Sequence, residues 1–409
     1  MSTREIDVQQ EILRLVSDPA ARADPYPVYE RIRAADGGYL GELGFWFITS
    51  YDDCASLMRH PLMKRRHQNS WEMRGAMSNA LGRPWFEGAS RSMLWLDNPD
   101  HARIRGLVSR AFTPRYLARL RPRIEEMVDG LIDRLKGKPR FDLIDDFALA
   151  LPMMVICEML GVPSEDRASF RRWTVALAAT LEPLPSERVQ DAADEASHAF
   201  DMYFADLVRK RRGSPGDDLL SELIHVEEEG DRLNEKELIG MSILILGAGF
   251  ETTINLIGNG MVALLRNPDE WRALVNRPEA APAVVEEVLR YDSPVQMAPP
   301  RVASAPLQLS DRSISEGDTV VAMLGAANRD PDRYEDPATF DISRPDPAPL
   351  SFGGGPHYCI GATLARIEGA IAFRSLASRL PSLELADDEP NWRETFNIRG
   401  LNSLVILNR

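Results

Sequence analysis

Apolar residues recur at helical spacing over most of the chain, and strict alternation is confined to short stretches. The helical spacing predicts amphipathic helices over residues 24–36, 124–134, 143–160, 165–181, 189–212 and 217–229, with proline or glycine between them. Alternation predicts a hairpin over 39–50, short strands over 293–304 and 307–323, and a closing hairpin over 396–407. The pattern therefore predicts a mainly helical α+β fold with small sheets.

The longest helical pattern runs from about residue 235 to residue 265. Asn234 followed by Glu237 three residues later predicts a capping box at its start. Gly247 and Gly249 lie in the middle, where each glycine costs about 1 kcal/mol relative to alanine. Such a pair indicates either close approach of a ligand, a local bulge, or simply close packing of two helices.

The same stretch carries candidate chemistry. Leu244, Ala248 and Thr252 share one face of the predicted helix, and Thr252 is expected to bond the carbonyl of Ala248. Glu251 adds an acid to an otherwise apolar segment. A small pocket with a hydroxyl and an acid beside it could bind dioxygen and deliver protons. The alternative is a Glu251 that is merely solvated.

A glycine-rich loop with one thiol precedes the last predicted helix. Residues 352–361 are Phe-Gly-Gly-Gly-Pro-His-Tyr-Cys-Ile-Gly, and a helical pattern begins at Thr363. Cys359 therefore lies just before a helix N-terminus, where free N–H groups and the helix dipole favour a thiolate. A thiolate held in this way suits an iron that needs an electron-rich axial ligand. Four glycines are expected to remove Cβ atoms where a flat macrocycle would press: Gly353, Gly354, Gly355 and Gly361. A buried structural cysteine beside an ordinary turn is the alternative.

Composition and charge narrow the class of protein. The 409 residues could form two or three domains by length alone, yet no boundary in the sequence supports a split. The formal charge of -14 argues against nucleic acid or an anionic membrane as the principal partner. The N-terminus has no apolar signal core, and the longest apolar run, 242–250, is too short to span a bilayer, so a cytosolic protein is expected. Cys54, Cys157 and Cys359 lie far apart, without a Cys-x-x-Cys motif that would indicate a disulfide framework or covalent haem attachment.

Two further stretches are unusual for this composition. From His101 to Arg123 the chain has seven arginines and no acidic residue, and His101 lies one helical turn before Arg105. This local reversal of charge indicates an anion nearby, such as haem propionates or an acidic protein, unless the helix faces are merely solvated. Residues 64–96 lack a stable period but carry large apolar side chains, which is typical of a lid or binding loop or, alternatively, of a satellite cluster.

Together these segments resemble the cytochrome P450 family, the haem-thiolate monooxygenases, of the soluble bacterial type. Residues 352–361 match the family's pattern Phe-x-x-Gly-x-(His or Arg)-x-Cys-x-Gly at every defined position. The oxygen-activating segment is matched by Ala248, Gly249, Glu251, Thr252 and Thr253. The Glu-x-x-Arg pair is matched by Glu287 and Arg290, and the meander arginine by Arg344.

The resemblance implies one domain over residues 1–409, with the P450 fold and a long central helix over the haem. It implies haem b with Cys359 as the iron ligand. Its cofactor-binding positions correspond to His101, Arg105, Arg301, Phe352, His357, Cys359 and Gly361. Its catalytic positions correspond to Glu251, Thr252 and Ala248, whereas Glu287, Arg290 and Arg344 would be structural.

The resemblance also implies a substrate pocket and partners. The pocket positions correspond to Trp71, Trp85, Phe86, Leu244, Ala248, Val295, Gln296, Met297 and Ile398, which are largely apolar. The expected reaction is hydroxylation of a small apolar secondary metabolite, a polyketide or macrolide, a terpenoid or an aromatic compound. O2 would be the oxidant, and a separate ferredoxin with its reductase would deliver electrons by docking on the arginine-rich stretch.

Other outcomes stay open at this point. The same site could carry out epoxidation, oxidative coupling or peroxide-driven oxidation, although the Glu251–Thr252 pair favours the dioxygen route. A haem-binding sensor and a helical interaction protein without a cofactor are alternatives outside this class of enzyme. Neither nucleic acid nor a membrane is expected as a partner, and a cytoplasmic location is expected.

Overall fold

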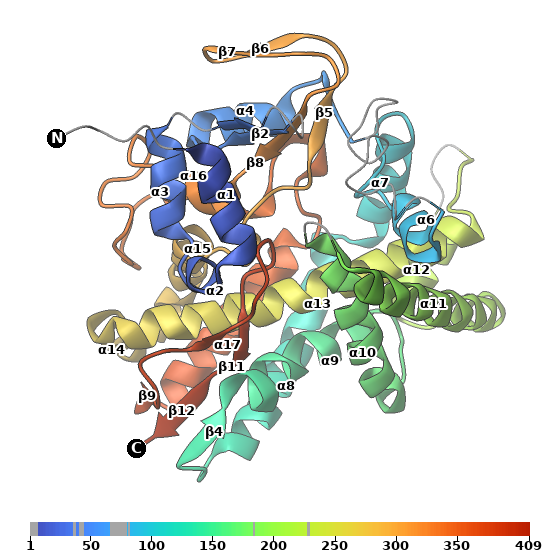
Figure 1. Ribbon diagram of the computed structural model, residues 1–409. Helices are drawn as coiled ribbons and strands as arrows, with labels where there is room; N and C mark the ends of the chain where they lie inside the picture. Colours follow the sequence, from blue (N-terminus) through green and yellow to red (C-terminus); the bar gives the residue numbers. More distant parts are fainter. Residues whose placement is uncertain are drawn as a thin grey trace.

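The longest helix, α13 (Glu235–Arg266), crosses the molecule, and other helices pack on its sides (Figure 1). The computed structural model describes residues 7–35, 38–40, 45–65, 80, 82–182, 185–226 and 230–409. Helices α9, α10, α11, α15 and α17 all contact α13. This arrangement makes α13 the element around which the described chain is built.

Local sequence explains where α13 begins. Asn234 Oδ1 accepts a hydrogen bond from the Glu237 N–H at 3.0 Å, and the Asn234 N–H donates to Glu237 Oε2 at 2.9 Å. The predicted capping box is thus confirmed. By length and composition α13 could cross a membrane, but most of it is buried among the other helices, as in the core helix of many proteins.

The remaining helices follow the predicted helical order. In the first half of the chain they are α1 (Val8–Ser17), α2 (Pro19–Ala23), α3 (Tyr26–Ala34), α4 (Tyr51–Arg59), α6 (Pro84–Ser90), α7 (Asp100–Ala111), α8 (Pro114–Leu135), α9 (Ala150–Met159), α10 (Arg167–Ala178) and α11 (Glu187–Gly213). In the second half they are α12 (Leu219–His225), α14 (Pro268–Asn276), α15 (Ala281–Tyr291), α16 (Leu324–Ala327) and α17 (Ala362–Arg379). Short 3-10 or π turns lie between several of them.

Four small sheets complete the described structure. The largest has the order β1-β2-β8-β5-β3, formed by Gly38–Leu40, Phe45–Ile48, Thr319–Ala322, Arg301–Ala303 and Met63–Lys64. A three-stranded sheet, β4-β12-β9, joins Arg140–Asp142, Val405–Asn408 and Leu383–Leu385. Two hairpin-like pairs are β6 (Leu307–Leu309) with β7 (Arg312–Ile314), and β10 (Asn391–Trp392) with β11 (Leu401–Ser403). The strands are short, and in Figure 1 β2, β5, β6, β7 and β8 lie in the upper part of the view, whereas β4, β9 and β12 lie at the lower left.

The core is divided in a way that positions the central helix. A large cluster of buried apolar residues joins α13 to α8, α9, α15 and α17, with Phe250, Phe147 and Phe373 among its fully buried members. A second cluster packs α1 and α3 against residues near Met323, and a third packs α4 against the largest sheet. Burial of large apolar side chains on all sides of α13 holds its middle turns in a fixed place.

Some sequence predictions are wrong in their bounds or partners. The helix predicted over 124–134 begins ten residues earlier, at Pro114, because Pro122 is accommodated within α8. Of the predicted strand over 293–304, only Arg301–Ala303 pairs in a sheet. The hairpin predicted over 396–407 is displaced, because β11 pairs with β10 upstream of residue 396, whereas β12 pairs with β4 and β9. The N–H groups of residues 396–398 bind the carboxylate of Glu182, a partner that no local pattern could indicate.

Glu368 in the middle of α17 makes stability depend on pH. Its side chain is 1% exposed, and Oε2 has no hydrogen-bond partner within the described part of the chain. Burial raises the pKa of this carboxyl to about 8 from the ordinary 4.5, so the folded state keeps a proton that the unfolded chain releases. The free energy of unfolding therefore falls as pH rises from about 4.5 towards 8.

Replacing Glu368 with Gln should remove this dependence. In denaturant unfolding, the free energy of unfolding of the unmodified protein should fall by about 3 kcal/mol from pH 5 to pH 8 because of Glu368, and the variant should lack this fall. Glu384→Gln on β9, whose side chain is 52% exposed, is the control and should leave the pH dependence unchanged. Parallel pH curves for Glu368→Gln and the unmodified protein would contradict this assignment.

Candidate active site

The cysteine loop is fixed by backbone hydrogen bonds at the start of α17. The Cys359 N–H donates to the Phe352 carbonyl at 2.9 Å, and the backbone N–H groups of Gly361 and Ala362 favour the thiolate form of Cys359. Burial on the protein side raises the pKa of the Cys359 thiol, while these N–H groups and the charges of nearby arginines oppose the rise. The residue remains accessible on its other side. The loop therefore presents a sulfur with N–H donors already in place, as an anionic metal ligand requires.

Two glycines of this loop are already required by the protein's own backbone. Gly355 has φ +63°, and a Cβ there would lie 2.5 Å from the Met58 carbonyl oxygen of α4. Gly353 also has a positive φ, +72°. A Cβ on Gly361 would meet only the Cys359 sulfur, at an ordinary 3.8 Å. At Gly355 the neighbouring backbone and the chain's own turn thus already require glycine.

The Phe352 ring and the loop carbonyls are held by two arginines. The Arg366 guanidinium lies 4.5 Å from the centre of the Phe352 ring and pairs with Glu286 of α15. Arg105 of α7 donates to the Tyr358 carbonyl at 2.7 Å. These contacts connect α7, α15 and α17 around the thiol.

Imidazoles and guanidiniums gather beside the cysteine loop. The rings of His101 and His357 have centroids 4.1 Å apart, and Arg105, Arg301 and Arg65 act on both rings. Burial, followed by the neighbouring cations, lowers the pKa of His101 and lowers that of His357 to about 2. Burial also lowers the pKa of Arg301, which is 5% exposed.

Two buried nitrogen atoms of this cluster are not hydrogen-bonded to other described residues. His101 Nε2 and Arg301 Nε have no hydrogen-bond partner within the residues that the structure describes. Sequence reasoning found four of the five members but missed Arg65, which matches no motif and follows β3. Cationic groups that are buried together favour an anionic ligand with more than one acceptor, such as a pair of carboxylates.

The middle of α13 presents an accessible stripe on a helix that is otherwise buried. Ala248 is exposed, and Leu244 and Thr252, one turn before and after it, are half-buried. Thr252 Oγ1 donates to the Ala248 carbonyl at 2.7 Å, as the sequence predicts. The two glycines differ, because a Cβ on Gly249 would lie 2.6 Å from Ile156 Cδ1 of α9, whereas Gly247 has open space. Close helix packing explains Gly249, and only Gly247 leaves room for a ligand.

Glu251 is not solvated. Its side chain is 7% exposed, and Arg393 Nη1 contacts both carboxylate oxygens, at 2.7 and 2.8 Å. The alternative of a solvated Glu251 is therefore wrong. Arg393 was missed by sequence reasoning because it lies 142 residues away, in a segment without a motif.

Some of the predicted pocket residues are at least partly exposed, whereas others are buried. Val295 and Ile398 form an isolated antiparallel bridge, and Phe86 is half-buried. Trp85 is 4% exposed in a cluster with Ala193 of α11, edge-on to Phe86. Trp71 lies outside the described residues.

Gln296 and Met297 use their side chains within the protein. Gln296 Oε1 accepts from the Tyr29 hydroxyl at 2.8 Å, and Nε2 donates to the Ser293 carbonyl at 2.6 Å. Met297 belongs to the cluster around α1 and α3. The pocket role predicted for Gln296 is thus corrected, since a fully paired, 1% exposed amide is a structural group.

Behind the cysteine loop lies a buried ion-pair network. Arg290 donates to Glu287 through Nε and Nη2, at 2.8 and 2.7 Å, and the two side chains are 0% and 1% exposed. Arg344 Nε lies 3.5 Å from the same carboxylate. Arg290 also donates to the carbonyls of Pro337 and Thr339 at 2.8 Å. The network holds the irregular chain that leads to the cysteine.

Comparison with known proteins agrees with this geometry. The cytochrome P450 family profile matches residues 72–277 and 271–393. The chain belongs to the cytochrome P450 family.

Two relatives and one solved structure illustrate the similarity. The polyketide biosynthesis cytochrome P450 PksS of Bacillus subtilis is 40% identical over 363 residues, 88% of this chain and 88% of that protein. The cytochrome P450 monooxygenase PikC of Streptomyces venezuelae is 41% identical, over 94% of this chain and 91% of that protein. The ligand-free crystal structure of Mycobacterium smegmatis CYP164A2 superposes with a TM-score of 0.89 at 41% identity, covering 98% of this chain and 100% of that one.

A P450 implies a haem-thiolate cofactor, and the residues present fit one. Cys359 offers an accessible sulfur with two N–H donors, which suits an axial thiolate. The buried donors of His101 and Arg301, with Arg105 and Arg65 close by, suit two propionate carboxylates. The chain is accordingly an oxidoreductase of the P450 monooxygenase type.

Removing the charge of Glu287 should destabilise this P450 strongly. Glu287→Gln keeps the side chain's size but leaves Arg290 as a buried cation without its carboxylate, which costs about 3–5 kcal/mol. Denaturant unfolding measures the loss. Glu286→Gln is the matched control, because its pair with Arg366 is 27% and 34% exposed and should cost about 1 kcal/mol or less. Equal losses for the two variants would contradict the structural role of the network.

Proposed function

We propose that this P450 binds haem b through Cys359 and hydroxylates a small apolar secondary metabolite. The observation that carries the proposal is the accessible Cys359 sulfur at the start of α17, close to His101 and Arg301, whose buried Nε2 and Nε atoms have no partner among the described residues. In the reaction a C–H compound, O2, two electrons and two protons would give the alcohol and water. We also propose that residues 1–409 form one P450 domain and act in the cytoplasm.

The bound haem would supply dioxygen binding and the oxidising power for the C–H bond. The side chains of this chain would do the rest. Cys359 would ligate the iron and donate electron density to it, and His101, His357, Arg105, Arg301 and Arg65 would hold the propionates. Ala248 would leave room for dioxygen, and Thr252 Oγ1 with Glu251 would pass protons towards it. Glu287, Arg290 and Arg344 would act only through the fold.

An apolar substrate would suit the apolar side chains that are proposed to surround it. Leu244, Ala248, Phe86, Val295 and Ile398 are proposed to line the pocket, and none of them is charged. The relative named for polyketide biosynthesis, PksS, supports a polyketide or macrolide before a terpenoid or an aromatic compound. Epoxidation, oxidative coupling or peroxide-driven oxidation at the same site is the second candidate reaction.

The electrons are proposed to come from an acidic ferredoxin. Within the arginine-rich stretch, Arg103 pairs with Glu237 and Arg123 with Glu158, so these two are already neutralised. Arg115 and Arg119 are exposed on the first turns of α8. Opposite charge on a ferredoxin would steer its approach to this face.

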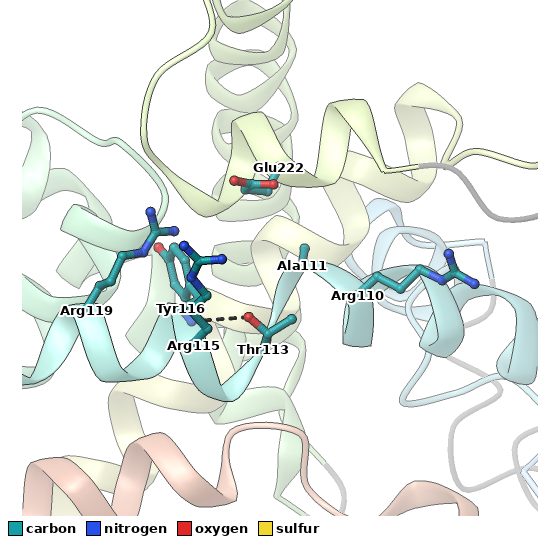
Figure 2. A pocket seen from close by; sticks show the side chains of 7 residues that line it. All are labelled: Arg110, Ala111, Thr113, Arg115, Tyr116, Arg119 and Glu222. Carbon is teal, nitrogen blue, oxygen red and sulfur yellow. Dashed lines mark hydrogen bonds between the residues drawn. The ribbon is translucent and has the colours of Figure 1, made fainter.

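Figure 2 shows the cavity at this face, of about 250 Å³, where α7 ends and α8 begins. It is lined by Arg110, Ala111, Thr113, Arg115, Tyr116, Arg119 and Glu222. Glu222 of α12 is the one acid among these lining residues, so the rim carries a net positive charge. A carboxylate of the partner would find cationic groups there.

The visible spectrum of the purified protein tests the proposed cofactor. Reduced protein exposed to carbon monoxide should show a red-shifted thiolate-type band, and Cys359→Ser should lose it. Titration with polyketide, terpenoid and aromatic candidates should give a spin-state shift with one class. A histidine-type band that Cys359→Ser leaves unchanged would refute the proposed ligation.

Charge reversal tests the proposed docking face. Arg115→Glu should lower the rate of electron transfer from an acidic ferredoxin about tenfold at low salt, and the difference should shrink as salt screens the charges. Arg110→Glu should act in the same direction. Arg172→Glu on α10, equally exposed, is the control and should change the rate little. Electron transfer without salt dependence, and without loss in Arg115→Glu, would reject this face.

A further inference from the structure

Residues 393–398, between β10 and β11, contact two parts of the proposed active site at once. At one end Arg393 binds Glu251 of α13. At the other end Ile398 forms the bridge to Val295. We call residues 393–398 the anchored segment. It spans only six residues, so a displacement at one end reaches the other.

The anchored segment is held by one carboxylate from outside. Glu182, just after α10, accepts from three consecutive N–H groups: Phe396 at 2.6 Å, Asn397 at 3.1 Å and Ile398 at 3.1 Å. Asn397 Nδ2 also donates to the Leu181 carbonyl at 3.4 Å. Burial raises the pKa of Glu182, while the three N–H groups and Arg22 oppose that rise. A half-buried carboxylate thus satisfies the N–H groups of a turn that belongs to no sheet.

Bonds within the anchored segment and to its neighbours make it rigid. The Arg393 N–H donates to the Gly400 carbonyl at 2.9 Å, and Arg393 Nε donates to the Leu401 carbonyl at 3.1 Å. The Asn397 carbonyl accepts from the Gln296 N–H at 2.9 Å, and Asn397 Oδ1 accepts from the Met297 N–H at 3.1 Å. This explains why Gln296 and Met297 are buried although they follow the predicted pocket position Val295.

The chain after the segment also packs directly on α13. A Cβ on Gly400 would lie 1.9 Å from Asn255 Oδ1, one turn after Glu251. Asn255 is fully buried. Gly400 therefore allows a backbone approach that fixes the height of the segment over the Glu251 turn. The close approach of Gly400 to Asn255 and the ion pair between Arg393 and Glu251 therefore both hold the chain against the same part of α13.

We propose that Glu182 and Arg393 are positioning residues: Glu182 fixes the anchored segment, and the segment in turn fixes the placement of Glu251 through Arg393. The inference rests on the proposed function, because Glu251 is assigned there to proton delivery. Glu182 holds the segment, and Arg393 transmits its position to the Glu251 carboxylate.

Hydrogen exchange tests the anchor without using the haem reaction. Glu182→Gln keeps the side chain's size but removes the charge that binds three N–H groups, so amides of residues 396–398 should exchange at least tenfold faster. Glu394→Gln is the matched control, since this neighbouring side chain is 81% exposed and lies 3.8 Å from Arg22. Equal amide exchange rates of residues 396–398 in Glu182→Gln and in the control would show that Glu182 does not hold the anchored segment.

Electron accounting tests the coupling to Glu251. With a plant-type ferredoxin and its reductase, the share of reductant electrons recovered as hydrogen peroxide should rise at least twofold in Arg393→Gln and in Glu182→Gln. Arg393→Lys keeps a cation, so its peroxide share should stay close to that of the unmodified protein. Glu394→Gln should leave the peroxide share unchanged. Thr252→Ala is the reference for failed proton delivery.

The outcomes separate the two levels of the proposal. A raised peroxide share in Thr252→Ala with none in Arg393→Gln would overturn the positioning role of Arg393. No change in any variant, Thr252→Ala included, would remove the proton relay of the proposed function and with it the coupling. Faster exchange at 396–398 in Glu182→Gln would still establish the anchor in that case.

Discussion

The active site depends on the buried pair of Glu287 and Arg290. The two ions lie at the end of α15, and Arg290 also binds carbonyls of the irregular chain after α16. Asn328 in that chain accepts from the Leu350 N–H at 2.7 Å and donates to Ser351 at 2.8 Å. Leu350 and Ser351 begin the turn that leads to the cysteine loop. Without regular secondary structure, this part of the chain is held in place by buried charge and by hydrogen bonds to it.

Charge is arranged in opposite ways on the two sides of the proposed haem site. Around the cysteine loop, arginines gather beside His101 and His357, and His101 Nε2 and Arg301 Nε have no partner in the part of the chain that the structure describes, which suits an anionic group from outside. Around the middle of α13, the acid Glu251 already has its partner in Arg393. One side is therefore built to bind charge and the other to hold a charge in place. This difference is what separates a cofactor-binding role from a proton-delivery role in the proposal.

Several features could be predicted from the sequence because their causes are local. The capping box at Asn234, the bond from Thr252 to Ala248 and the Glu287–Arg290 spacing each involve residues three or four positions apart. The cysteine loop is likewise one continuous stretch, so its match to the P450 family needed no tertiary information. Periodicity also placed most helices, since each buries one apolar face on its neighbours.

Contacts between distant segments were decided only by the tertiary structure. Arg65 joins the cationic cluster, Arg393 binds Glu251 and Glu182 binds residues 396–398, over separations that no periodicity encodes. Gln296 is a further example, because it was predicted to line the pocket but its side chain is hydrogen-bonded to Tyr29 and Ser293. The sequence by itself determined the helices, the thiol loop and the family. The fold decided which buried charges meet. A buried charge is costly unless it is paired, and only the packing determines which partner lies close enough to pair with it.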